Sequence, residues 1–167
     1  FDGDTRNVLA LIDEAHNLVE RGRNMYSASI SKNAFLKAKK SFKILDHKKI
    51  KNASKRIDKM FKKYGLFPDG ETLIDNIEIT EYRAIEAYLL AALDVMKHHH
   101  DIVDDSFKDF YFELNRFSRL LDFYDESSIL YVHKDGKDIR MSLLCLDPSL
   151  HIYNSLNQIK GRIIFSG

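Results

Sequence analysis

Three long stretches of the sequence repeat apolar residues every three or four positions, and this spacing is typical of amphipathic helices. They cover residues 47–64, 80–100 and 104–124, and Thr80 is the expected N-cap of the second. The third stretch is rich in aromatic residues and is expected at the centre of the core. Only 2 prolines and 7 glycines occur among 167 residues, which favours long helices over a loop-rich β fold.

Short strands are expected at the two ends of the chain and in one hairpin. Continuous apolar runs over residues 8–12 and 162–165 are typical of buried parallel strands. Apolar runs also flank Asp135-Gly136, a dipeptide that suits a tight hairpin turn. A further helix, N-capped by Ser31, is expected to reach about residue 45.

Charge is segregated along the chain, although the formal net charge is only +1. Residues 32–63 carry 13 basic and 2 acidic side chains, whereas residues 64–128 carry 5 basic and 15 acidic ones. The basic block either follows a nucleic-acid backbone with salt-dependent affinity, or forms a solvated helix face that the acidic block partly neutralises. The expected nucleic-acid contacts are Lys39, Lys40, Lys43, Lys48, Lys49, Lys51, Lys55, Arg56, Lys59, Lys62 and Lys63.

Other residues of interest also have a structural interpretation. Phe35, Phe42 and Phe61 in the basic block, and Tyr64 directly after it, could stack on bases, but their helical spacing favours core packing. The single cysteine, Cys145, excludes a disulfide framework and is expected to be a small buried hydrophobe. No apolar run approaches the roughly 18 residues of a membrane span, so no membrane partner is expected.

The histidine run at residues 98–100 lies close to several aspartates. Three adjacent histidines on a helix cannot converge on one ion, because consecutive side chains point about 100° apart. His100 and Asp104 stand four residues apart and could share a metal. The simpler interpretation is a polar helix end, where cationic histidine is favoured near the C-terminus.

The strongest functional pattern is Ile12-Asp13-Glu14-Ala15-His16, which follows the first apolar run. In open α/β sheets, ligands bind at the carboxyl ends of the strands. Asp13 could hold Mg²⁺ through water, and Glu14 could orient or deprotonate an attacking water. His16 could pass the state of the phosphate side to another domain. The alternative is a chance tetrapeptide at an ordinary strand-to-helix junction.

Residues 11–18, LIDEAHNL, resemble the Walker B (DEAH-box) motif of superfamily two helicases of the DinG/XPD type. Residues 145–149 and 161–167, CLDPS and GRIIFSG, resemble the approach to the Ser-Gly-Thr motif of the same family. The resemblance implies that Asp13 is the magnesium carboxylate, that Glu14 is the catalytic base for ATP hydrolysis and that His16 is a coupling residue. Ser166 would belong to the motif that links hydrolysis to DNA movement.

The same resemblance implies a domain organisation. Residues 1–30 would hold a motor strand with the DEAH box, residues 31–142 a helical arch-like insert, and residues 143–167 the return to the motor. The expected fold is mainly α, with a small β-hairpin in the insert. Two strands of a RecA-like α/β motor sheet would flank the insert and lie side by side. In this family the arch helps to form the opening through which single-stranded DNA passes.

The expected function is that of a fragment of an ATP-dependent DNA helicase, whose parent protein binds Mg²⁺ and ATP and acts in DNA repair in the bacterial cytoplasm. The missing initial methionine and the end inside a motif fit a fragment. No G-x-x-x-x-G-K-[ST] loop is present, so the chain alone is not expected to hydrolyse ATP. The iron–sulfur domain of many relatives precedes the DEAH box, outside this sequence.

The expected partners are single-stranded DNA, ATP and the rest of the motor. The alternative is a helical protein-interaction platform without direct DNA contact.

Overall fold

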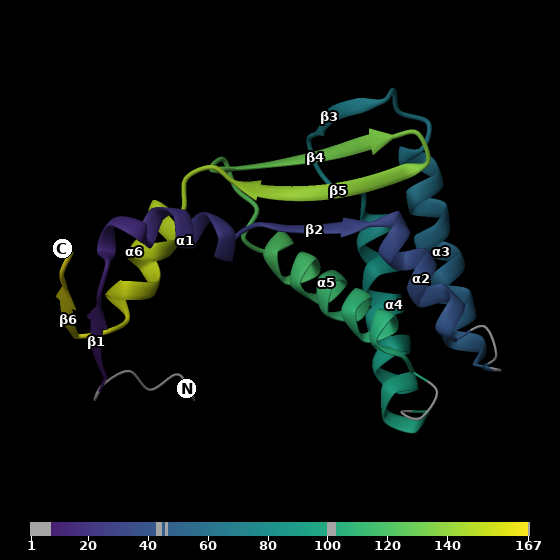
Figure 1. Cartoon of the computed structure of the whole chain (residues 1–167), viewed down its shortest axis with the longest axis horizontal. Helices are drawn as coiled ribbons and strands as arrows, with labels where there is room; N and C mark the ends of the chain where they lie inside the picture. Colours follow the sequence, from purple (N-terminus) through teal and green to yellow (C-terminus); the bar gives the residue numbers. More distant parts are fainter. Residues whose placement is uncertain (1–7, 43–44, 46, 100–102, 167) are drawn as a thin grey trace.

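The computed structural model describes residues 8–42, 45, 47–99 and 103–166. These residues form a helical body that packs on a four-stranded sheet, with a smaller unit of helices and two strands at one side (Figure 1). Lys43 and His100 lie outside the described residues, so the roles expected for them remain predictions.

Four helices make the body and largely follow the apolar periodicity. They are α2 (Lys32–Ser41), α3 (Lys48–Tyr64), α4 (Ile79–His98) and α5 (Asp105–Leu121). Their antiparallel sheet has the order β2-β5-β4-β3. Its strands are β2 (Ala28–Ser31), β3 (Gly70–Ile74), β4 (Ser128–Asp135) and β5 (Asp138–Cys145).

The smaller unit contains both ends of the chain. It consists of β1 (Leu9–Ile12), the 3-10 turn η1 (Ala15–Asn17), α1 (Leu18–Met25), α6 (Ser149–Asn157) and β6 (Gly161–Ile164). The four-stranded sheet crosses both domain boundaries expected from the sequence, because β2 begins at residue 28 and β5 ends at residue 145. The body and the smaller unit are thus joined through continuous strands.

Two strands of the sheet, β2 and β3, were not expected from the sequence. Each has only one or two strongly apolar residues, ASIS in β2 and GETLI in β3, so neither shows a clear alternating pattern. Both are edge strands that form by pairing with the predicted hairpin of β4 and β5. The formation of β2 and β3 therefore depends on pairing with strands that are distant in the sequence, and not on a local pattern.

One apolar core lies between the sheet and the helices. Phe35 of α2 is fully buried, with its ring centroid 5.8 Å from that of Phe61 and 5.5 Å from that of Phe110. Helix α5 buries Phe107, Phe110 and Phe117 completely, so its expected central place is confirmed. The three aromatic residues of the basic block and the adjacent Tyr64 are buried too, which confirms core packing and not base stacking for them.

The structure corrects two local expectations. Helix α4 begins after Glu78 and not after Thr80, because the Glu81 carboxylate accepts a hydrogen bond from the Glu78 N–H at 3.0 Å. Neither terminal strand is buried, since β1 and β6 are each other's single neighbour among the described strands. Leu9 and Leu11 are 59% and 64% exposed, and Ile163 and Ile164 are 51% and 55% exposed. Ser31, by contrast, caps α2 as expected.

Among the helices that the structure describes, none combines the length and the apolar character needed to span a bilayer.

A buried carboxylate ties α3 to the start of α4. Glu81 accepts hydrogen bonds from Lys63 Nζ and from the Tyr64 hydroxyl, both at 2.9 Å, and is almost fully buried. Burial, and after it the Glu81 charge, raises the pKa of Tyr64 far above its ordinary value. Burial alone would lower the pKa of Lys63, but Glu78 and Glu81 outweigh it and raise that pKa. One carboxylate therefore accepts hydrogen bonds from a lysine and from a phenol at the same time.

We predict that Glu81→Ala destabilises the chain by about 2–4 kcal/mol, because it leaves the buried Tyr64 hydroxyl without an acceptor and removes the capping hydrogen bond from the Glu78 N–H. Chemical denaturation of the variant measures the loss. Glu86→Ala, at an exposed position of the same helix, is the control and should shift stability by less than about 0.5 kcal/mol. Equal losses for the two variants would contradict the role given to Glu81.

Candidate functional site

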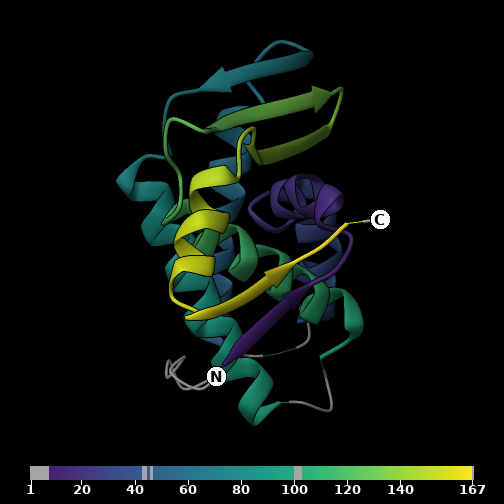
Figure 2. The same cartoon turned by 90° about the vertical axis from the view of Figure 1, so that its left-hand side faces the viewer.

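The two ends of the chain meet through a parallel pair of strands. Residues 9–12 of β1 stand opposite residues 161–164 of β6 in register (Figure 2). The pairing continues past the strands: the Phe165 N–H donates to the Ile12 carbonyl at 3.0 Å, and the Ala15 N–H donates to the Phe165 carbonyl at 3.2 Å. Both strands therefore end at the same edge, where the acidic motif turns into η1.

At this edge, residues from the two predicted motifs are in direct contact. His16 Nδ1 lies 2.9 Å from Ser166 Oγ and 3.2 Å from Glu14 Oε2. His16 and Ser166 are 150 positions apart in the sequence, so the contact exists only because β1 and β6 pair. The structure thus brings Glu14, His16 and Ser166 together as one polar group.

The backbone holds Glu14 in an uncommon conformation. Glu14 has φ 53° and ψ 46°, in the left-handed region, and it is the one non-glycine residue with positive φ among those described. For a residue with a Cβ this costs roughly 1–2 kcal/mol. The Asp13 carboxylate accepts the Glu14 N–H at 2.7 Å, which favours the sharp turn. Strain of this kind is typical of sites where the direction of a side chain matters.

The side chains at this edge are open to solvent. Glu14 and His16 are 50% and 55% exposed, and Asp13 is also exposed. Carboxylate oxygens are the ligands that Mg²⁺ prefers, so Asp13 and Glu14 suit a hydrated cation in chemical type. Both carboxylates are therefore accessible to a ligand from solvent.

Helix α1 connects this turn to the helical body. Gly22 lies so close to α6 that a Cβ there would stand 2.6 Å from the Ile152 side chain and 2.9 Å from Pro148. Arg23 Nε donates to the Leu146 carbonyl at 2.8 Å, across the chain's return from β5. The Cys145 N–H donates to Ser27 Oγ at 3.0 Å. Helix α1 is therefore fixed against the segment that leads into α6.

The end of α1 is also fixed to α5. Arg116 Nη2 donates to the carbonyls of Asn24 and Ser27, at 2.6 and 3.0 Å. The Tyr26 ring stacks on the His151 ring with centroids 4.5 Å apart. We name the set Tyr26, Ser27, Arg116 and His151 the joint, because it connects α1 with both α5 and α6. Sequence analysis did not identify the joint, since its members are far apart in the sequence and belong to no local pattern.

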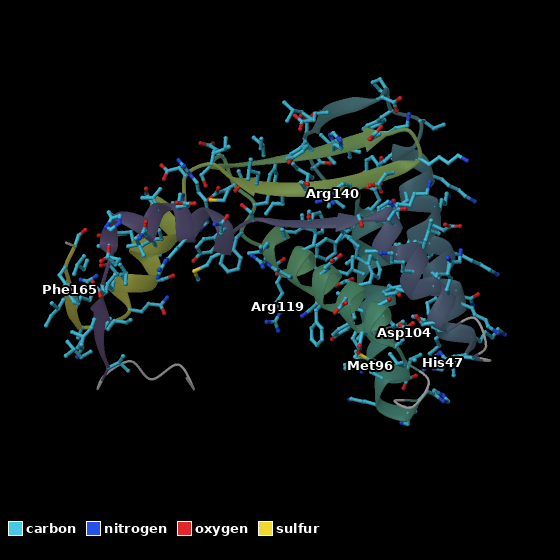
Figure 3. All side chains as sticks on the ribbon, in the orientation of Figure 1. His47, Met96, Asp104, Arg119, Arg140 and Phe165 are labelled. Carbon is cyan, nitrogen blue, oxygen red and sulfur yellow. The ribbon has the colours of Figure 1, made fainter. Side chains whose placement is uncertain are left out.

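The basic block lies away from this edge. Figure 3 shows Phe165 at one end of the molecule, and His47, the N-cap of α3, near the other. Along α3 the cations occupy two sides. Lys48, Lys55 and Lys59 recur at helical spacing opposite the buried face, and we call them the outer stripe. Lys49, Arg56, Lys59 and Lys63 line hollows beside α4, so Lys59 lies where the two sides meet.

Acidic residues neutralise part of the basic block. Asp58 lies 3.5 Å from Lys39 Nζ and 3.7 Å from Lys62 Nζ, and Asp94 lies 3.7 Å from Lys49 Nζ. Lys63 is shared between Glu78 and Glu81. Within the part of the chain that the structure describes, no ion pair is formed by the remaining cations Lys40, Lys48, Lys55, Arg56 and Lys59. Acidic neighbours thus neutralise one part of the block, whereas the cations of the other part remain available to a nucleic-acid backbone.

The histidines near residue 98 do not form a metal cluster within the described ranges, where no group of three or more suitable ligands occurs. His98 Nδ1 lies 3.1 Å from an Asp94 carboxylate oxygen one turn earlier. Cys145 is fully buried, as expected.

Comparison with known proteins gives structural likeness only. No protein-family model and no curated protein matches the sequence. An XPD helicase aligns with a TM-score of 0.50 and 18% identity, over 97% of this chain and 28% of its own. Xpd4 of S. tokodaii aligns with a TM-score of 0.51 and 22% identity, over 96% of this chain and 33% of its own.

The chain therefore spans about a third or less of the length of these solved structures. The likeness extends over nearly all of the chain, and it confirms the mainly helical fold with flanking strands that the sequence predicts. At these levels of identity, the fold is what the chain shares with a region of XPD helicases.

Proposed function

We propose that this chain is part of an ATP-dependent DNA helicase of the XPD/DinG type. It would run from the Walker B motif, across the arch, to the next motor motif. The observation that supports this most is the contact of His16 with Ser166 beside Glu14. A chance tetrapeptide has no reason to meet, through parallel strands, the other segment that resembles a motor motif.

In this proposal Asp13 holds Mg²⁺ through water and Glu14 positions or deprotonates the attacking water. When bound, Mg²⁺ neutralises charge on the phosphates of ATP. The strained backbone at Glu14 and the hydrogen bond from its N–H to Asp13 fix the two carboxylates relative to each other. A phosphate-binding loop from the rest of the motor would cradle ATP, so the chain alone hydrolyses none.

We propose further that the joint connects this site with the arch. His16 contacts the end of β6 through Ser166, and α1 leads from the same turn to Arg116 and Tyr26. A shift of the turn on hydrolysis would therefore reach α5 through a short, packed connection. Single-stranded DNA would contact the outer stripe of α3, where three lysines have no acidic partner among the described residues.

We predict that Glu14→Gln in the full-length protein lowers the rate of ATP hydrolysis by about 10²- to 10⁴-fold, because the amide cannot accept a proton from water. Steady-state phosphate release measures the effect, and a nucleotide-binding assay should show retained affinity. Glu20→Gln, on the exposed side of α1, is the control and should leave turnover unchanged. Normal turnover in Glu14→Gln, or hydrolysis by the chain alone that Glu14→Gln removes, would disprove the proposal.

We predict that the chain binds oligothymidylate with an affinity that falls steeply with salt. Replacing Lys48, Lys55 and Lys59 together by alanine should reduce the log–log salt slope by about 2, from about 0.7 per lost contact with a single strand. Fluorescence anisotropy at several salt concentrations measures the slope. Alanine at Lys108, Lys137 and Lys160 removes the same charge elsewhere and is the control. An equal change of slope in both variants would refute the specific role of the outer stripe.

A further inference from the structure

A groove runs along the outside of the helix pair α3 and α4. Its first hollow has a volume of about 620 Å³, and Ala53, Ala87 and Ala91 lie on its floor. Leu90 and Leu93 border it and are 71% and 38% exposed, so neither belongs to the core. The groove is thus apolar at its base and open to solvent.

The groove continues toward the start of α4. A second hollow of about 560 Å³ is lined by Arg83, Ala84 and Lys63, and both hollows share Arg56. The helices are antiparallel, since Lys49 reaches Asp94 at one end of the pair and Lys63 reaches Glu81 at the other. Alanines at positions 84, 87 and 91 repeat at helical spacing, and their short side chains leave the hollow between the helices.

Cations dominate the rim of the groove. Asp94 is the one acidic residue lining the first hollow, and Lys49 and His47 already pair with it. Burial alone would raise the pKa of Asp94, but Lys49 and the two histidines near it hold that pKa below its ordinary value. In the second hollow, Glu78 and Glu81 are engaged by Lys63.

Four cations of the rim therefore keep their charge available. They line the hollows and form no ion pair with any residue in the described ranges: Arg56, Lys59, Arg83 and Lys97. Arg56 lies where the two hollows meet, with Lys97 toward one end of α4 and Arg83 toward the other. The groove thus combines an apolar floor with positive charge along its length.

The chemistry of the groove favours an acidic helix over single-stranded DNA. Proteins that bind single strands stack bases on aromatic rings, and no residue lining either hollow is aromatic. Of the rings next to lining residues in the sequence, Phe61, Tyr64 and Tyr88 are buried in the core. Tyr82 is half-buried, lines neither hollow, and donates its hydroxyl to Asp122 at 3.0 Å. An amphipathic helix needs an apolar groove for its apolar stripe and a charged rim for its flanks, and the groove offers both.

We propose that the α3–α4 groove is a docking site for an acidic amphipathic helix of a partner protein. Its aliphatic side chains would pack on the alanine floor beside Leu90, and its carboxylates would pair with Arg56, Arg83 and Lys97. The distance from Thr80 to Lys97 along α4 is about 25 Å, which corresponds to about five turns of a partner helix. This inference does not depend on the helicase proposal, because it is argued from the lining of the groove alone. Lys59 lines the second hollow and also belongs to the outer stripe, whereas Lys48 and Lys55 line neither hollow.

The test uses a synthetic helical peptide of about 18 residues, with leucine at helical spacing and glutamate on both flanks. Fluorescence anisotropy should show that it binds the chain, whereas a scrambled peptide of the same composition should not. Arg56→Glu should weaken peptide binding at least about 10-fold, because the substitution places a negative charge on the groove opposite the glutamates of the peptide. Lys55→Glu makes the same charge change one residue away, on the outer side, and should change affinity by less than about 2-fold.

Leu90→Asp gives a second test that is independent of Arg56. It replaces an exposed side chain, so the fold should persist by circular dichroism while peptide binding is lost. Leu66→Asp, at an exposed leucine outside the groove, is its control. Equal binding of the scrambled peptide, or no effect of Arg56→Glu and Leu90→Asp, would overturn the proposal. So would the opposite pattern, in which Arg56→Glu weakens oligothymidylate binding and leaves peptide binding intact.

Discussion

Two short parallel strands, β1 and β6, determine where everything else in this structure can lie. Their pairing brings positions about 150 residues apart to a single edge, so the intervening chain must leave and return at neighbouring points. The antiparallel pairing of β2 with β5 and the packing of α1 against α6 meet this requirement. An insert whose ends are adjacent can be large without separating the strands that flank it.

The helical body has its own core and meets the smaller unit at few points. Aromatic rings from α2, α3, α4 and α5 fill that core, while the connection to the smaller unit depends on the joint and on the strands that pass between them. This arrangement suits a body that moves as a unit when its attachment moves. It also separates the surfaces: the motif edge lies at one end of the molecule, whereas the outer stripe and the α3–α4 groove both lie on the helical body.

The sequence predicts the helices well because their buried faces recur at three- and four-residue spacing. It does not predict β2 and β3, whose formation depends on partners distant in the sequence. By residue type alone Thr80 is the better single cap of α4, but the helix begins after Glu78 because Glu78 and Glu81 form a capping box. The motif residues could be named from resemblance, but Arg116 and His151 act through contacts with no sequence signal. The sequence alone does not show which lysines of the basic block are neutralised by acidic residues and which are available to a nucleic acid, because this depends on the helix face on which each lysine lies.

The most direct test of this account is the contact between His16 and Ser166 in solution. Nitrogen-15 NMR of the His16 imidazole, compared between the chain and its Ser166→Ala variant, measures it. The account predicts a marked shift of the His16 Nδ1 resonance on Ser166→Ala and none on the control Ser155→Ala. The amides of Ala15 and Phe165 should keep their protection from hydrogen exchange in both variants, because backbone carbonyls accept them. An unchanged His16 signal in Ser166→Ala, with those two amides unprotected, would show that the ends of the chain do not form one site.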